Sequence, residues 1–226
     1  MKSIIIKLGI SFFCLTKLYA VDWGKLDSLD GKYFFDGQLF TGQAIKHLDT
    51  GLMEGGFQDG IRHGFWKKWN RIGEPILIGY YEMGLKHGEW KQWYDNERKR
   101  RKEIDANFIH NKYDGTYKEW YANGKKSIFG TYVNGLEHGK YQEWHENGKK
   151  ALVITFKDGG RNGTWTQWYE NGKKEMTVEY VNDVPWGKAK FWFEDGSIQG
   201  QGTLKDEVPG GGWLVEDDDG ALRVYK

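Results

Sequence analysis

The sequence contains a single cysteine, Cys14, among its 226 residues. Because Cys14 lies in an N-terminal segment that we expect to be removed, the mature chain has no cysteine. A chain without cysteine cannot form disulfides, use thiol chemistry or bind a metal through thiolates. This lack excludes those devices, whatever the redox state of the compartment.

The sequence also lacks an excess of positive or negative charge. The sequence has 33 Lys and Arg residues against 32 Asp and Glu residues, a formal net charge of +1. Three of the lysines lie in the N-terminal segment that we expect to be removed. A near-neutral chain has no general attraction to nucleic acid or to an anionic membrane. We therefore expect no nucleic acid partner.

Residues 1–20 have the pattern of a secretory signal peptide. Lys2 supplies the positive start, residues 4–15 are mostly apolar, and Ala20 ends a plausible cleavage site. The segment is too short, and too soon followed by charge, to span a bilayer. We expect an exported protein, periplasmic or extracellular. Lipidation of Cys14 is the alternative, although Phe13 stands where a small residue normally precedes a lipidated cysteine.

Glycine and aromatic residues recur with a period. The chain has 32 Gly and 12 Trp, and 16% of its residues are aromatic, a composition typical of a repeat. A glycine followed two residues later by Trp or Tyr recurs, mostly every 24 residues, and we call it the anchor glycine. The anchors are Gly42, Gly64, Gly88, Gly115, Gly139, Gly163, Gly187 and Gly211, with Ala in the aromatic place after Gly42 and Gly187.

Two turns are predicted in each repeat. Nine residues after the anchor, the turn glycines Gly124, Gly148, Gly172 and Gly196 follow Asn or Asp, a dipeptide that predicts a type I′ turn. A second turn falls four residues before the next anchor, as at Asp59-Gly60, Asn134-Gly135 and Asp158-Gly159. Two short strands fit between the turns, for example residues 164–169 and 174–181.

The second strand of each repeat alternates between apolar and polar residues, as in Met176, Val178 and Tyr180, which indicates one buried face. A single hairpin is marginal in water, so neighbouring hairpins must bury this face by stacking. We predict an all-β, elongated single-sheet solenoid of stacked antiparallel β-hairpins. We assign residues 21–41 to an N-terminal lead-in and half-repeat cap, 42–220 to eight hairpin repeats, and 221–226 to a C-terminal closing strand.

Units such as GTWTQWYENGKKEMTVEYVND resemble bacterial MORN-repeat variants, a group often labelled YwqK-like antitoxins. The resemblance covers about residues 31–220. It implies stacked hairpins and a binding or scaffolding role, with lipid binding proposed for some MORN repeats. The antitoxin label implies a toxin as partner.

Two aromatic columns follow the anchors. The first lies two residues after the anchor and is expected on the core face. The second lies three residues further on, an odd spacing that places it on the opposite face of a regular strand. Either a bulge turns both columns into the core, where the rings pack as an inter-repeat ladder, or the second column is an exposed stripe that binds a polypeptide, glycan or lipid. The second column comprises Trp69, Trp93, Trp120, Trp144, Trp168 and Trp192.

The longest repeat contains a basic run. It consists of Arg98, Lys99, Arg100, Arg101 and Lys102. The run is either a solvated loop or a contact for anionic lipid, glycan or an acidic protein.

The remaining polar residues indicate structure rather than chemistry. His63, His87 and His138 precede anchors, where we expect turn hydrogen bonds and no metal site. Glu146 faces Lys149 across a turn, where such a pair would support a hairpin. The chain has no nucleophile motif, phosphate loop or metal signature, so we expect no enzyme and no cofactor.

The expected function is a non-catalytic interaction or scaffolding module that binds another protein or a surface polymer, with a monomer favoured. One alternative is a membrane- or lipid-associated protein that uses residues 98–102. Another is an antitoxin-like neutralising partner.

The signal-peptide assignment has a direct test. We expect the exported protein to begin at Val21, because cleavage follows Ala20. N-terminal sequencing and intact-mass measurement would check this. A chain that begins at a lipid-modified Cys14 would contradict it.

Overall fold

The computed structural model describes residues 20–95, 100–209 and 211–225. The expected signal peptide up to residue 19, with Cys14, lies outside the described residues, as do Arg98 and Lys99. The described chain is all-β apart from one short 3-10 helix, η2 (Trp23–Lys25). The predicted all-β fold of antiparallel hairpins is confirmed. No helix of the described residues is long and apolar enough to cross a membrane.

The chain divides into two compact units, Met1–Leu85 and Lys86–Lys226. In the first unit, β5 to β8 form an antiparallel meander, β1 pairs parallel with β5, and β2 to β4 form a small separate sheet. Its strands are β1 (Val21–Asp22), β2 (Asp27–Leu29), β3 (Lys32–Phe35), β4 (Gln38–Leu39), β5 (Gly42–Leu48), β6 (Gly51–Gln58), β7 (Ile61–Asn70) and β8 (Pro75–Glu82).

Aromatic rings from the lead-in cover one face of this meander. Phe57 and Trp66 are buried there, and the ring of Trp23 meets both edge-on at centroid distances of 5.7 and 5.4 Å. Gly55 lies under Trp66, since a Cβ atom there would sit 2.2 Å from the indole ring. The first unit therefore buries its face with the residues that precede its first hairpin.

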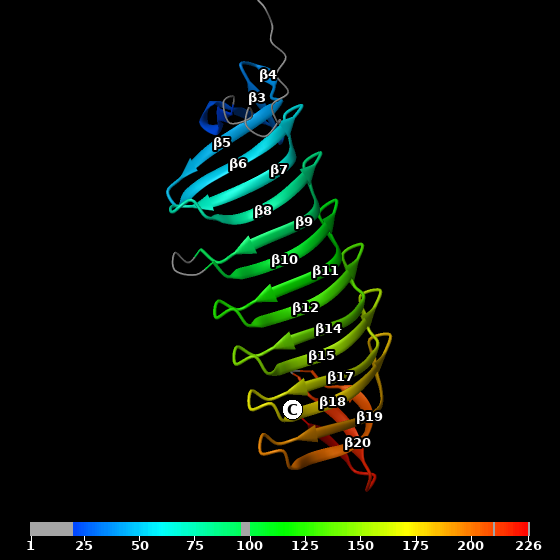
Figure 1. Cartoon of the computed structure of the whole chain (residues 1–226). Coiled ribbons are helices and arrows are strands. Elements are labelled where there is room, and N and C mark those ends of the chain that lie inside the picture. The colour runs from blue at the N-terminus through cyan, green and yellow to red at the C-terminus, as the bar shows by residue number, and fades with distance from the viewer. Residues whose placement is uncertain (1–19, 96–99, 210, 226) are drawn as a thin grey trace, which may run out of the picture. The chain divides into compact units, whose positions relative to one another are not determined.

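The second unit is a run of antiparallel hairpins, most of whose strands pair with the next one along the chain (Figure 1). β9 starts at the last residue of the first unit. The strands are β9 (Leu85–Trp93), β10 (Lys102–Ile109), β11 (Lys112–Trp120), β12 (Lys126–Val133), β13 (Leu136–Glu137), β14 (Gly139–Trp144), β15 (Lys150–Lys157), β16 (Gly160–Arg161), β17 (Gly163–Trp168), β18 (Lys174–Val181), β19 (Val184–Trp192), β20 (Ile198–Glu207), β21 (Trp213–Asp217) and β22 (Leu222–Tyr225).

The pairing register defines two faces of this sheet. Trp165 lies opposite Val178, and both side chains point to the side that we call the inner face, as expected for the first aromatic column. Trp168 lies opposite Lys174, and these two point to the outer face. The register shifts between Gln167 and Trp168, and the same shift recurs at the equivalent place of the other hairpins. A β-bulge therefore does accompany the second Trp column.

The anchor glycines also lie at irregular places in the strands. Gly115 has φ +100° and Gly163 has φ +113°, values that side chains with a Cβ rarely adopt. Around Gly115 the register shifts between Ala106 and Phe108. Anchors such as Gly115 and Gly187 therefore serve as bulge glycines, which bend and twist the strands.

The turns differ from the prediction in type. At Asn147-Gly148 only the glycine has positive φ, so the predicted type I′ turn is wrong there. The loop is longer. The backbone N–H of Tyr169 donates to the Lys173 carbonyl and so closes a loop over residues 169–173, and the equivalent residues of other repeats form the same hydrogen bond. Type I′ geometry occurs instead at the second turns, where both residues of Asp158-Gly159 have positive φ.

The C-terminal strands cover part of the inner face. Figure 1 shows β21 and β22, in red, crossing behind β17 to β20. Tyr225 stacks on Phe191 with ring centroids 4.8 Å apart and planes 9° apart. Its ring lies on Gly200, where a Cβ atom would sit only 2.1 Å away. The buried cluster beneath these strands contains Ile154, Val178, Tyr180, Ala189, Phe191, Leu204, Val215 and Tyr225.

The packing of Tyr225 predicts which strands lose stability when its ring is removed. Tyr225→Ala should destabilise β19 to β22 by about 3 kcal/mol, because it removes a buried ring from a packed site. Hydrogen exchange followed by mass spectrometry would locate the loss.

Leu222→Ala is the matched control, since Leu222 lies on the same strand with 61% of its surface exposed. It should change the local stability by less than about 0.5 kcal/mol. Equal effects of the two substitutions would contradict the packing described.

Candidate interaction surface

The second Trp column lies on the outer face, despite the bulge that accompanies it. Trp120 pairs with Lys126 and Trp144 with Lys150 across their hairpins. All six rings of the column are half-buried. The structure therefore agrees with neither alternative in full, because the rings are neither in the core nor fully exposed.

Lysines separate the rings of successive repeats. Lys126, the strand partner of Trp120, also holds its ammonium group 5.8 Å from the ring centroid of Trp144. Lys150 stands in the same way between Trp144 and Trp168, at 5.9 Å from the latter. We call this column the Trp–Lys ladder. It contains Trp93, Lys102, Trp120, Lys126, Trp144, Lys150, Trp168, Lys174 and Trp192.

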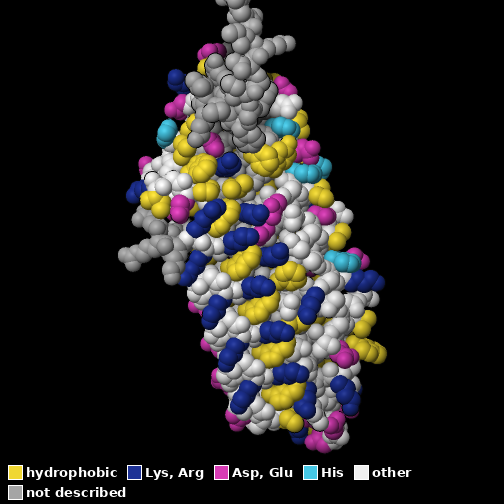
Figure 2. All heavy atoms as spheres, viewed as in Figure 1, with side chains coloured by type: hydrophobic (Ala, Val, Ile, Leu, Met, Phe, Trp, Pro, Cys, Tyr) yellow, Lys and Arg dark blue, Asp and Glu magenta, His cyan; other side chains and the backbone are white. Residues whose placement is uncertain are grey.

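The alternation is visible on the molecular surface. Figure 2 shows hydrophobic and basic side chains in alternating order down the face that carries β11 to β20. Each cation lies near an aromatic ring, an arrangement worth about 0.5–1 kcal/mol at an exposed site. The ladder therefore joins the hairpins and at the same time presents a column of positive charge.

A second set of contacts joins the repeats at their loops. The Tyr121 hydroxyl donates to the backbone carbonyl of Trp144 at 2.6 Å, and Tyr169 donates to that of Trp192 at 2.8 Å. Burial raises the pKa of Tyr121, and nearby Glu146 and Glu143 raise it further. The hydroxyl therefore stays protonated and remains a donor.

A third set joins one loop to the next. The Asn147 side chain donates to the Glu170 carbonyl at 2.7 Å, and Lys149 Nζ donates to the Asn171 carbonyl at 2.6 Å. The predicted pairing of Glu146 with Lys149 is therefore wrong, because the lysine reaches the following repeat. The turn glycine Gly172 accommodates this, since a Cβ atom there would sit 2.9 Å from Lys149 Cδ.

The described part of the basic run belongs to the outer face. Arg100 lies over the Trp93 ring, 4.2 Å from its centroid, and is exposed. Arg101 donates to the backbone carbonyl of Ala122. Lys102 pairs with Asp105 at 2.6 Å and lies 5.4 Å from the Trp120 ring centroid. Arg100 and Lys102 therefore lie beside the first two Trp rings of the ladder, and Arg101 binds the backbone of the next loop.

The first unit contains one Trp of the column. Trp69 pairs with Leu52, and Lys67 lies 5.7 Å from its ring centroid. A shallow depression of about 530 Å³ adjoins it, lined also by Glu54 and Arg71. His47 stands at the Trp position of the preceding repeat and also pairs with Leu52.

The histidines lie at turns. His63 Nδ1 accepts a hydrogen bond from the Met83 backbone at 3.4 Å, and His138 lies 3.3 Å from Asp158. His87 lies beside His110, with ring centroids 5.5 Å apart. His63 and His138 thus have the turn contacts that we expect from the sequence.

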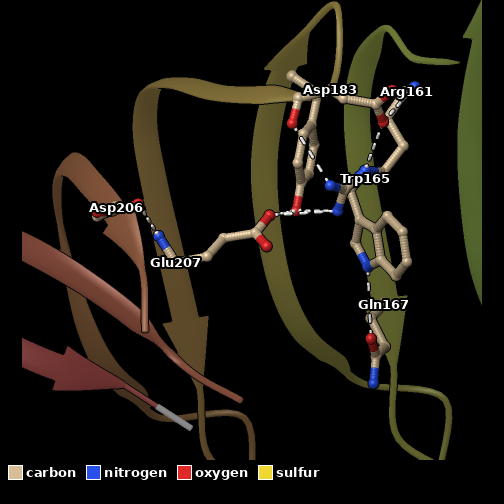
Figure 3. A network of polar contacts seen from close by, with 7 residues as sticks. Arg161, Trp165, Gln167, Asp183, Asp206 and Glu207 are labelled. Carbon is tan, nitrogen blue, oxygen red and sulfur yellow. Dashed lines mark hydrogen bonds and ion pairs between the residues drawn. The ribbon is translucent and has the colours of Figure 1, made fainter. Parts of the chain in front are cut away.

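A polar network on the inner face escaped the sequence analysis (Figure 3). Arg161 pairs with Asp183 at 3.0 Å and with Glu207 at 3.2 Å. The Tyr180 hydroxyl donates to Glu207 at 2.9 Å, and the guanidinium lies 4.1 Å from the Tyr180 ring centroid. Hydrogen bonds from the Arg161 backbone and side chain lower the pKa of Asp183. The network ties β16 to the end of β20.

Comparison with known proteins follows the repeat pattern. A family model described as MORN repeat variant matches residues 113–134, 137–158, 161–182 and 187–206. Each matched segment spans one hairpin of the second unit. Among curated proteins, no sequence matches the chain.

The ladder predicts the cost of losing one ring. Trp144→Ala should destabilise β14 to β17 by about 2 kcal/mol, roughly half the cost of removing a fully buried ring. Site-resolved hydrogen exchange would measure it.

Trp186→Ala removes the same ring from the same unit, where the side chain is 66% exposed. This control should cost less than about 0.5 kcal/mol. An equally small cost for Trp144→Ala would mean that the ladder does not hold the repeats together.

Proposed function

We propose that this chain, whose residues 113–206 are four repeats of the MORN repeat variant family, is a non-catalytic binding or scaffolding module of the cell envelope or the extracellular space. The family match supports a repeat module. The signal-like residues 1–20 support export. The predicted partner is another protein or a surface polymer.

The Trp–Lys ladder is the observation that carries this proposal. Lys126, Lys150 and Lys174 are exposed and form no ion pair with any described residue. Their ammonium groups lie 5.7 to 5.9 Å from the centroids of Trp rings, so their positions are held before a partner arrives. Little side-chain freedom is then lost on binding. A partner with repeated negative charge fits such a surface.

The distance between successive lysines of the ladder indicates which kind of partner can bind. Successive lysines of the ladder are two strands apart, which corresponds to about 9.6 Å. An acidic polymer, or an acidic protein surface that runs along the sheet, would meet several of them at once. Several weak charge contacts made together give useful affinity although each alone gives little.

An anionic lipid surface is the second candidate. It is favoured by Arg100, which is exposed on Trp93 at the start of the ladder. Clustered basic residues attract anionic headgroups, and salt weakens the attraction. The antitoxin-like role stays a prediction from the resemblance alone.

The proposal predicts a charge-dependent interaction. Changing Lys126, Lys150 and Lys174 together to Gln should weaken binding to poly-L-glutamate by about tenfold at low salt. Gln keeps part of the stem beside each Trp ring, so the fold should persist. Fluorescence anisotropy across a salt series would measure the affinity and its salt dependence.

The control changes Lys25, Lys112 and Lys157 to Gln, three exposed lysines away from the ladder. Equal weakening by both triple variants would reject the ladder as the binding surface. Vesicles of phosphatidylcholine with phosphatidylglycerol test the second candidate. If they bind the protein and poly-L-glutamate does not, the lipid role replaces the polymer role.

A further inference from the structure

One position of the repeat holds a cation against aromatic rings on the inner face. It lies two residues before the anchor glycine. In the first unit Arg62 occupies it, 4.9 Å from the Trp66 ring centroid. In the second unit Lys86 lies 4.7 Å from the Trp90 centroid and 5.0 Å from that of Phe108. Each unit thus has a repeat in which a positive charge lies over aromatic rings at this position.

Arg161 shows the most complete form of the arrangement. Its guanidinium stacks over Tyr180, donates to the Tyr180 hydroxyl at 2.8 Å, and pairs with the Glu207 carboxylate (Figure 3). An aromatic face, a hydroxyl and a carboxylate together hold one arginine. The C-terminal strands close over this site, and Tyr180 is only 1% exposed.

Arg62, Lys86 and Arg161 are the cations at this position in three of the eight repeats, and Phe40, Tyr113, Glu137, Pro185 and Pro209 take it in the others. Two adjacent repeats of the second unit matter here. Tyr113 takes the position in one, and its ring fills the place beside Tyr117 and Tyr132 at centroid distances of 5.2 and 5.3 Å. Glu137 takes the position in the next, opposite Tyr132. Here the repeat has a carboxylate where three others have a cation.

The rings around Glu137 match those around Arg161. Tyr141 and Phe156 occupy the places of Trp165 and Tyr180 in the repeat, and their ring centroids are 5.8 Å apart. Burial and then Glu137 raise the pKa of Tyr132 to about 12, so its ring stays neutral. Among the described residues, no cation lies over Tyr132, Tyr141 or Phe156. These rings are half-buried, unlike Tyr180.

Two further carboxylates lie on the same stretch of the inner face. Glu119 accepts a hydrogen bond from Tyr117 at 2.8 Å, and Glu143 accepts one from Tyr141 at 3.0 Å. None of Glu119, Glu137 and Glu143 forms an ion pair with a residue in the described part of the chain. The inner face of β11 to β15 is therefore aromatic and acidic, whereas the outer face is aromatic and basic.

We propose that this inner stretch binds a basic segment of another polypeptide, with an arginine side chain seated over Tyr141 and Phe156 and paired with Glu137. The guest arginine would take the place that Arg161 holds in the neighbouring repeat. Arginine suits the site because its planar group stacks on rings and donates in a fork to carboxylates. Glu119 and Glu143 accept further basic residues of the segment, which extends along the sheet.

The proposal goes beyond the function of the outer face, since it concerns the opposite face and a partner of opposite charge. It commits to a polypeptide because three carboxylates spread over two repeats match a chain that carries several cations.

The experiment uses the mature protein and a fluorescent peptide of alternating arginine and glycine. We expect binding by the unaltered protein. Glu137→Arg installs the cation found in three other repeats and should weaken binding by about tenfold, through repulsion and occupation of the rings. Glu137→Gln, which changes the fold least, should weaken it several-fold.

Glu170→Arg is the matched control, since Glu170 is exposed on a loop of the same unit and the charge change is identical. It should leave the affinity within about twofold, because exposed distant charges are screened. A peptide with citrulline in place of arginine should not bind. Equal binding of the citrulline peptide, or equal effects of the Glu137 and Glu170 substitutions, would overturn the proposal.

The two faces can be tested separately. The variant with Lys126, Lys150 and Lys174 changed to Gln should still bind the arginine peptide, and Glu137→Arg should still bind poly-L-glutamate. Loss of peptide binding in the lysine variant would mean that one unspecific charge effect explains both interactions, and would overturn the inner-face site.

Discussion

A hairpin of the second unit cannot bury its own aromatic rings, and the rest of the structure depends on how the next hairpin compensates. An isolated hairpin is marginal in water. The following repeat supplies the missing contacts in three columns. Trp rings and lysine stems alternate on the outer face, Tyr121 and its equivalents bind carbonyl groups of the next Trp, and loop residues such as Lys149 bind the next loop. The sheet is therefore stabilised along its length rather than across its thickness.

Two bulges in the first strand of a hairpin, as in β11 and β19, allow a single sheet to use both faces. The anchor glycine, at positive φ, bends the first strand before its aromatic residue reaches the inner face. The second bulge precedes the outer Trp, as between Glu143 and Trp144. The two faces of this sheet carry different residues and therefore differ in charge. The lysines of the ladder lie on one side, and Glu119, Glu137 and Glu143 lie on the other.

Much of this architecture could be predicted from the period of the sequence. The strand at residues 174–181 and the pairing of Trp165 with Val178 follow from turn residues and alternation. Glycine in the alternating strand also leaves room for a ring, since a Cβ atom at Gly130 would sit 2.9 Å from the Tyr141 ring. Turn types were predicted less well. Asn-Gly suits a type I′ turn, but the loop at Gly148 is longer because the asparagine side chain caps it, with Asn147 accepting from the Lys149 backbone.

The candidate surface was only half predictable. Equal spacing identifies the Trp column, but the ladder depends on Lys126 lying between two rings of different repeats, and a linear pattern does not show which residues interleave. Backbone carbonyl partners, such as that of Lys149, are invisible in a pattern of side chains. The sequence alone could have identified Glu137. In an alignment of the repeats it stands at the same position as Arg62, Lys86 and Arg161 and has the opposite charge.

The contacts between loops have a consequence for how such a chain can change. Asn123, Asn147 and Asn171 each bind the equivalent carbonyl 23 residues ahead, so every donor meets a copy of the same acceptor. Removing one complete repeat from the middle of the second unit would let the flanking copies meet in the same geometry. Removing a few residues would leave donors without acceptors all along one edge. The chain can therefore gain or lose whole repeats at little structural cost. The number of side chains that each face presents to a partner changes with the number of repeats.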